Sequence, residues 1–106
     1  AHPADAMALG PVYGALVAGL GPDYDAFVER ISGLGSGDLT PTGYLGSACI
    51  KFTCEADWAI LYLHRETQQV FAIWHVYGEI ENRIFPQDTN IWPPEAMYLL
   101  RDRAGD

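Results

Sequence analysis

The sequence predicts a small α+β domain: an antiparallel sheet with a central hairpin, packed against one or two helices, with a Cys-x4-Cys loop at the sheet edge. Residues 58–64 and 70–77 are rich in aromatic and β-branched side chains and flank the polar turn 65–68, which is the pattern of a β-hairpin. Apolar residues recur at helical spacing over residues 23–34. The chain has 106 residues, of which 49% are hydrophobic and 19% charged, as expected of one globular domain.

Two helices are expected before the sheet. Residues 6–22 contain no charge, but this stretch is slightly short for a membrane span and is interrupted at Gly10 and Pro11. It predicts a buried helix over residues 12–20, with Pro11 at an early helical position. The second helix, over residues 23–34, carries an apolar stripe that is a natural cover for one face of the hairpin. The stripe consists of Tyr24, Phe27, Val28, Ile31 and Leu34.

The hairpin is the best-defined element of the predicted sheet. If its turn sets the register, Trp58 faces His75 and Tyr62 faces Phe71. Both faces of the hairpin are then apolar, so both must be covered. The hairpin therefore belongs at the centre of the sheet or in a subunit contact.

The segments around the hairpin complete the predicted fold. Residues 35–42 have little apolar content. The segment at 79–85 alternates in part between polar and apolar residues, and Pro86 ends it. Pro93 and Pro94, followed by an acidic residue, are typical of a helix start. In chain order, we expect a loop at 35–42, a short strand at 44–49, a further strand at 79–85, a turn at 87–90 and a C-terminal helix from Pro93 to Leu100 or Arg101.

The charge of the chain restricts its partners. A net charge of −8 argues against nucleic acid, which requires a basic stripe, and against an anionic membrane surface. A small acidic protein suits a basic protein partner, because complementary charge speeds encounter, although net charge can also serve solubility alone. We expect no cofactor, and the oligomeric state, a homodimer included, stays open.

Cys49 and Cys54 are the two cysteines of the chain, and a disulfide between them would close a small loop. Such a bridge removes roughly 2 kcal/mol of unfolded-chain entropy, so it would shape the loop more than hold the fold. It would place the protein in an oxidising compartment such as the periplasm. No region led by Lys or Arg opens the chain, so we expect an exported protein whose signal peptide has been removed.

Two chemical alternatives use the cysteines differently. A zinc site would take Cys49, Cys54, His64 and His75, but this spacing fits no common structural zinc site, and the two histidines lie at opposite ends of the predicted hairpin. A nucleophilic cysteine could pair with His75, although no Gly-rich oxyanion turn or partner acid is evident. A small enzyme or metal-binding domain is therefore ranked below a non-enzymatic binding protein, with no catalytic or metal residue expected.

The loop between the cysteines is the favoured functional element. An exposed Ile50 and Phe52 on a constrained turn would form a preorganised anchor that enters a pocket at low entropic cost. Alternatively, both side chains fold back into the core, and the sequence leaves the two arrangements open. Glu55 and Asp57, just past the loop, are typical of a solvated edge and would form a rim around a basic cleft. The expected target-binding residues are Ile50, Lys51, Phe52 and Thr53.

The run Ser47-Ala48-Cys49, the four residues after it and Cys54, followed at once by a hairpin, resembles the Ivy family, the bacterial inhibitors of vertebrate lysozyme. The resemblance covers roughly residues 24–77. It implies a small α+β fold, a periplasmic location and a single inhibitor domain over residues 1–106. It also implies that a bridged loop plugs the active site of a lysozyme-like peptidoglycan hydrolase.

The loop departs from the family pattern. Family loops typically read Cys-Lys-Pro-His-Asp-Cys, and their His and Asp engage the catalytic groups of lysozyme. Here Phe52 and Thr53 stand at those positions, after Ile50 and Lys51. The resemblance therefore implies the scaffold and the bridge, with a different or retuned target. A related alternative is an immunity protein that neutralises a peptidoglycan hydrolase delivered by type VI secretion.

Overall fold

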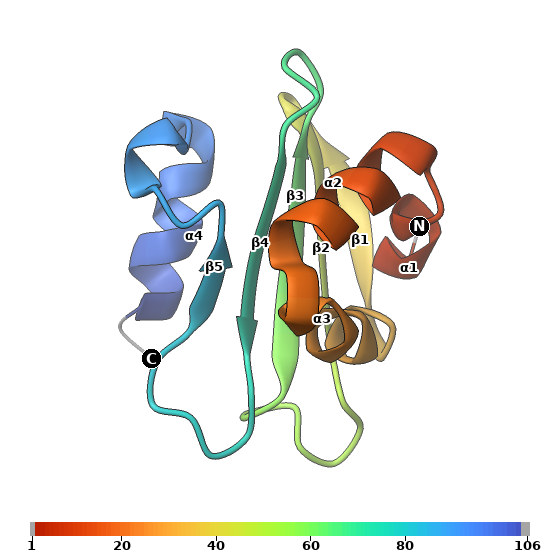
Figure 1. The fold of residues 1–106 in the computed structure, drawn as a ribbon, viewed down its shortest axis with the longest axis vertical. Coiled ribbons are helices and arrows are strands. Elements are labelled where there is room, and N and C mark those ends of the chain that lie inside the picture. Colours follow the sequence, from red (N-terminus) through yellow and green to blue (C-terminus); the bar gives the residue numbers. More distant parts are fainter. Residues whose placement is uncertain (1, 105–106) are drawn as a thin grey trace.

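A computed structural model describes residues 2–104 of the protein, with side chains described to residue 101. Its centre is a five-stranded antiparallel sheet whose strands lie side by side in chain order (Figure 1). The small α+β fold expected from the sequence is confirmed. The strands are β1 (Leu34–Thr40), β2 (Gly43–Cys49), β3 (Trp58–His64), β4 (Val70–His75) and β5 (Arg83–Phe85).

Helices cover both faces of this sheet, as Figure 1 shows, with the N-terminal helices on one face and the C-terminal helix on the other. None of the helices described within residues 2–104 is long and apolar enough to cross a membrane. One face carries α1 (Pro3–Met7), α2 (Gly10–Leu20), the 3-10 turn η1 (Gly21–Asp23) and α3 (Tyr24–Ile31). The other carries the 3-10 turn η2 (Thr89–Ile91) and α4 (Pro94–Ala104).

The central hairpin has the predicted register, with Trp58 opposite His75 and Tyr62 opposite Phe71. Because side chains alternate along a strand, β3 and β4 supply two separate cores, and the central position of the hairpin is confirmed. The core beneath α1–α3 contains Met7, Val12, Leu16, Leu20, Phe27, Ile31, Ala59, Leu61, Val70, Ala72 and Trp74. The core beneath α4 contains Trp58, Ile60, Tyr62, Phe71, Ile73, Trp92, Ala96 and Leu99.

The two predicted N-terminal helices are present, but the first buries only one side, with Val12, Leu16 and Leu20, and is not buried as a whole. The second is shorter than expected. Phe27 and Ile31 are fully buried in the core beneath α1–α3, as their stripe predicts. The helix ends at Ile31, and Leu34 lies instead in β1, where it is 55% exposed. The chain turns away at Gly33, where a Cβ would lie 2.1 Å from the Cys49 carbonyl oxygen, so only glycine allows this close approach.

The expected loop at residues 35–42 is wrong, because residues 34–40 form the edge strand β1. This strand pairs with β2 along its whole length. None of its residues is buried, so no apolar alternation marks it in the sequence, and backbone hydrogen bonds to β2 hold it in place. At Gly35 the strands come so close that a Cβ would lie 2.0 Å from the Ser47 carbonyl oxygen.

The C-terminal part also differs from the prediction in its boundaries. The expected strand at residues 79–85 is reduced to β5, because Gly78, with a φ of 88°, and the bond from the Glu79 N–H to the Val76 carbonyl make a turn there. The chain therefore rejoins the sheet only at Arg83. The turn expected at 87–90 overlaps η2, and the C-terminal helix extends to Ala104.

We expect Trp74→Ala to lower the free energy of unfolding by about 3–5 kcal/mol, the usual range for a buried aromatic side chain. Trp74 is 2% exposed and packs edge-to-face on Phe27, with ring centroids 5.5 Å apart. Denaturant unfolding measures the change. Leu39→Ala is a matched control, because Leu39 is 80% exposed and its truncation is expected to change stability by less than about 0.5 kcal/mol. A loss below about 1 kcal/mol for Trp74→Ala would contradict this core.

Candidate functional site

The segment between β2 and β3 is a short loop closed by a disulfide. Cys49 ends β2, and its Sγ is bonded to that of Cys54, with the Cα atoms 4.8 Å apart. The predicted bridge is therefore confirmed. The loop lies at the end of the sheet away from the hairpin turn at residues 65–69 (Figure 1), with β1 rather than β2 at the sheet edge.

Backbone hydrogen bonds make the loop compact. The Ile50 N–H donates to the Asp57 carbonyl at 2.9 Å, which continues the pairing of β2 and β3 by one step. The Thr53 N–H donates back to the Ile50 carbonyl at 3.0 Å, and this bond closes a β-turn over residues 50–53. The loop backbone is thus held by bonds of its own in addition to the disulfide.

Phe52 stands at the tip of this turn. Its side chain is 90% exposed, so the alternative in which Phe52 folds back into the core is wrong. Its φ is 76°, in the left-handed region that glycine and asparagine adopt at the third position of a turn and that is strained for a bulky residue. The Lys51 ammonium lies 5.2 Å from the centroid of the Phe52 ring. Neither burial nor backbone preference explains a phenylalanine at this position.

Among the four residues between the cysteines, Phe52 is the exposed apolar one. Ile50 and Thr53 are half-buried, and Lys51 is exposed. Glu55 is exposed, as a rim residue would be. The prediction that Asp57 lies at a solvated rim is wrong, because this residue is 6% exposed and lies beneath the loop.

Asp57 is buried because Arg30 of α3 neutralises it. The Arg30 Nη2 donates to Asp57 Oδ1 at 2.7 Å, and the Tyr77 backbone N–H donates to the same oxygen at 2.8 Å. The remaining Arg30 donors reach the His75 and Ala26 carbonyls, both at 2.8 Å. Each charge is therefore paired and hydrogen-bonded, as buried charges must be. Sequence reasoning missed Arg30, whose only signal is its place three residues after Phe27 on the buried side of α3.

The electrostatics of Asp57 follow from these contacts. Burial alone would raise the pKa of its carboxyl, but the bonds from the Tyr77 N–H and the Arg30 guanidinium outweigh burial and hold that pKa below its ordinary value. Asp57 is therefore a charged anchor that joins the end of the loop to helix α3.

His75 is held by the two neighbouring loops. Its Nδ1 lies 2.5 Å from the Ala56 carbonyl oxygen and its Nε2 lies 2.8 Å from the Glu79 carbonyl oxygen. Its ring stacks on Trp58, with centroids 6.1 Å apart and planes at 15°. Both ring nitrogens thus face backbone acceptors, and the contacts of this histidine are structural.

The chemical alternatives that use the cysteines are wrong, because the two sulfur atoms are bonded to each other. Neither thiol is available as a nucleophile beside His75 or as a zinc ligand. His64 lies at the other end of the hairpin, where its Nε2 pairs with Glu95 Oε1 at 2.8 Å. The four residues of the zinc hypothesis are therefore not brought together.

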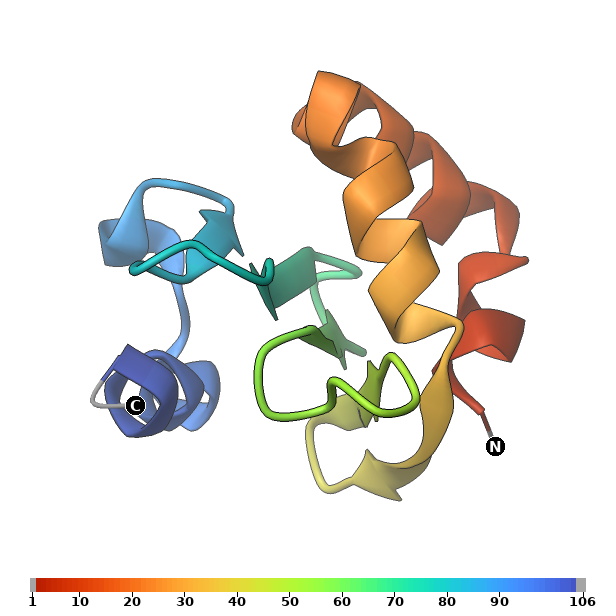
Figure 2. The same ribbon diagram turned by 90° about the horizontal axis from the view of Figure 1, so that it is seen from below.

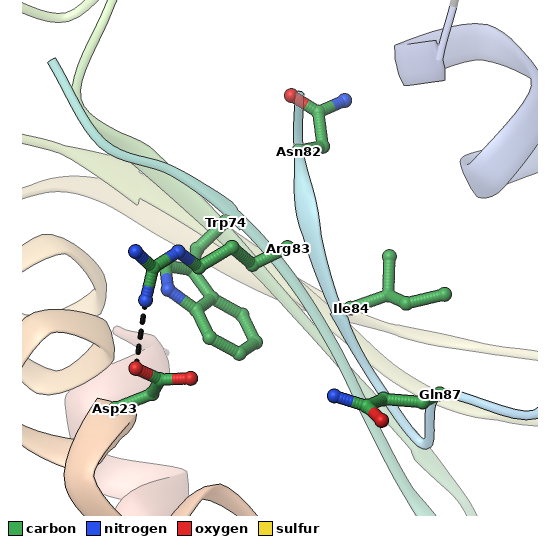
Figure 3. A pocket seen from close by; sticks show the side chains of 6 residues that line it. All are labelled: Asp23, Trp74, Asn82, Arg83, Ile84 and Gln87. Atoms are coloured by element: carbon green, nitrogen blue, oxygen red, sulfur yellow. Dashed lines mark hydrogen bonds and ion pairs between the residues drawn. The ribbon is translucent and has the colours of Figure 1, made fainter. Parts of the chain in front are cut away.

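A polar pocket of about 350 Å³ lies elsewhere, between η1 and strands β4 and β5 (Figure 3). Arg83 crosses it and donates to Asp23 Oδ1 at 2.7 Å. The Trp74 Nε1 is buried there without a hydrogen-bond partner among the described residues. None of the site residues expected from the sequence lines this pocket, whose walls are Asp23, Trp74, Asn82, Arg83, Ile84 and Gln87.

A family model described as inhibitor of vertebrate lysozyme (Ivy) matches residues 11–105, which include the whole sheet and the bridged loop. The chain belongs to the Ivy family. The match confirms the resemblance seen in the sequence and extends it beyond residues 24–77 in both directions.

One similar protein is "Uncharacterized protein y4bG" of Sinorhizobium fredii (strain NBRC 101917 / NGR234), which is 29% identical over 100 residues. The aligned region covers 94% of this chain and 36% of that protein, so the chain spans about a third of the length of this relative. No solved structure matches the chain. The Ivy family comprises inhibitors, which favours a non-enzymatic role for this domain.

We expect Asp57→Asn to lower the free energy of unfolding by about 3–5 kcal/mol, because it leaves the buried Arg30 guanidinium without its counter-charge. Thermal or denaturant unfolding at neutral pH measures the loss. Asp25→Asn is the matched control, since Asp25 is an exposed residue of α3. Equal stability of the two variants would contradict the anchoring role of Asp57.

The same pair predicts a dependence of stability on pH. Because the folded-state pKa of Asp57 is lowered, its contribution is present above the unfolded-state value of about 4 and is lost as pH falls through the folded-state value. We expect the wild-type protein to lose stability as pH falls below about 4 more steeply than Asp57→Asn does. Unfolding curves at stepped pH measure both slopes, and parallel slopes would contradict the assignment.

Proposed function

We propose that this domain binds a cell-wall degrading enzyme, a lysozyme or a lysozyme-like peptidoglycan hydrolase, and occludes its active site with the disulfide-closed loop. The main observation behind this proposal is the position of Phe52. Its large apolar side chain is 90% exposed, and its backbone has a strained φ of 76° at the tip of a covalently closed turn. Strain of this kind persists where the surrounding structure imposes it, and it gathers at functional sites.

The physical advantage of this loop is preorganisation. The disulfide, the turn bond from Thr53 to Ile50 and the ion pair of Asp57 with Arg30 order the loop before any partner arrives. Binding then costs little conformational entropy, so little of the free energy gained by burying the Phe52 ring is lost to ordering of the loop. A protruding ordered loop is the shape that an enzyme cleft accepts.

The charges of the chain favour this class of target. Glycoside hydrolases cut their substrate with a pair of carboxyl groups, and Lys51 supplies an exposed positive charge beside Phe52. The chain as a whole has a net charge of −8, which favours encounter with a basic enzyme. In this proposal Lys51 faces the catalytic carboxyl groups, and the acidic remainder of the domain directs the approach.

The sequence of the loop also supports a second candidate. Phe52 and Thr53 stand where family loops typically carry His and Asp, so the polar contacts to vertebrate lysozyme are replaced. An immunity protein that neutralises a type VI secretion peptidoglycan hydrolase would use the same geometry against another cleft. A disulfide-bonded protein suits the periplasm, where both kinds of hydrolase act.

We expect Phe52→Gly to weaken binding to the hydrolase by about tenfold to a hundredfold, since burial of such a side chain contributes about 1.5–3 kcal/mol. The change is expected mainly in the dissociation rate, which surface-immobilised binding kinetics measure. Stability is expected to stay within about 1 kcal/mol, because glycine adopts a positive φ without steric cost.

One variant controls this experiment, and a second tests the proposed role of the Lys51 charge. Leu39→Gly removes a side chain that is also strongly exposed, at the far end of β1, and is expected to leave binding unchanged. Lys51→Met keeps the aliphatic stem and removes the charge that the proposal places near the catalytic carboxyl groups. Unchanged dissociation for Phe52→Gly would contradict the proposed contact.

A further inference from the structure

A second loop lies beside the disulfide-closed loop. In an antiparallel meander, the connections β2–β3 and β4–β5 leave the sheet at the same end, and the β3–β4 turn lies at the other. Figure 2, which views the molecule from below, shows residues 76–82 next to residues 50–57. Both connections are therefore available to one partner that approaches this end of the sheet.

The second loop also exposes large apolar side chains. Ile80 is 96% exposed and Tyr77 is 70% exposed. Among the described side chains, four large apolar ones are at least 70% exposed, and three of them, Phe52, Tyr77 and Ile80, lie on these two loops. The fourth, Leu39, lies near the opposite end of the sheet. Strong apolar exposure is thus concentrated at one end of the molecule, where it marks an interaction surface.

The two loops are held rigidly against each other. Asp57, at the end of the first loop, accepts the backbone N–H of Tyr77 in the second at 2.8 Å. The His75 ring lies between the loops, with one nitrogen 2.5 Å from the Ala56 carbonyl oxygen and the other 2.8 Å from the Glu79 carbonyl oxygen. The spacing of Phe52 from the second loop is therefore set before binding.

The charges near this end favour one class of partner. Glu55 in the first loop and Glu81 in the second are both exposed. The carboxylate of Glu79 instead accepts hydrogen bonds from the Arg83 guanidinium, which lower the pKa of Glu79. The free acidic groups thus flank the apolar side chains, and they complement a basic rim on the partner.

The size of an interface supplies the remaining argument. A stable protein–protein contact buries about 800 Å² on each partner, with about 20–30 residues a side. The disulfide encloses only four residues, Ile50 to Thr53, so a contact confined to them falls well short of this area. The loop at residues 76–82 is the neighbouring surface that can extend it.

We propose that the loop at residues 76–82 forms the second half of the target-binding surface, with Ile80 and Tyr77 packing on the hydrolase outside the cleft that receives Phe52. This inference rests on the proposed function, since it takes the same partner for both loops. The occupant is a basic peptidoglycan hydrolase whose rim pairs an apolar patch with positive charge. Ile80 and Tyr77 then determine which hydrolases are bound tightly.

The test compares Ile80→Ser and Tyr77→Ser with wild type for binding to a vertebrate lysozyme, with Leu39→Ser as the matched control. We expect each variant in the second loop to weaken binding by about tenfold. We expect Leu39→Ser to bind as wild type does. Melting temperatures are expected to stay unchanged, because all three side chains are strongly exposed.

Phe52→Gly in the same series separates this inference from the proposed function. Weaker binding for Phe52→Gly with wild-type binding for Ile80→Ser and Tyr77→Ser would overturn the two-loop surface and leave the loop insertion standing. Wild-type binding for all of these variants would overturn both, since lysozyme would then be held by another face. Equal weakening by Leu39→Ser would also overturn the inference, because the effect would not be specific to this end.

Discussion

The buried ion pair between Arg30 and Asp57 is the interaction that holds together the end of the sheet where the disulfide-closed loop lies. It joins helix α3 to the end of the disulfide-closed loop, and its remaining bonds reach the backbone of His75 and Tyr77. Three segments that are distant in sequence, namely α3, the end of the disulfide-closed loop and residues 75–77, are thereby joined at one point. A buried pair of this kind is a poor source of net stability, but loss of either charge is costly, so it serves to specify one arrangement.

The two cores on either side of the sheet allow the connections between strands to expose apolar side chains. Because the central hairpin is apolar on both faces, helices cover the sheet on both sides, and backbone pairing from β1 to β5 holds the strands. The connections at the ends of the strands then carry little of the packing. Phe52 and Ile80 can stay in solvent at these connections, where their removal costs the core nothing.

The sequence predicted those features of the fold that depend on residues close together in the chain. The hairpin register follows from its turn and alternation, the buried side of α3 from its periodicity, and the bridge from two closely spaced cysteines. Edge strand β1 escaped prediction because its stabilisation comes from pairing with β2 and not from side-chain burial. Asp57 was misplaced because its partner lies 27 residues away on α3. The loop with Tyr77 and Ile80 was missed because alternating Glu79, Ile80 and Glu81 is typical of a strand.

The central claim, that the disulfide-closed loop occupies the active-site cleft of a peptidoglycan hydrolase, is tested most directly by competition. A lysozyme is titrated with the protein in the presence of increasing amounts of a short oligosaccharide that fills the substrate cleft. If the loop enters the cleft, the apparent dissociation constant rises linearly with the oligosaccharide concentration, because the two ligands exclude each other. An apparent dissociation constant that does not change while the cleft is saturated would contradict the claim, since both ligands would then bind at once.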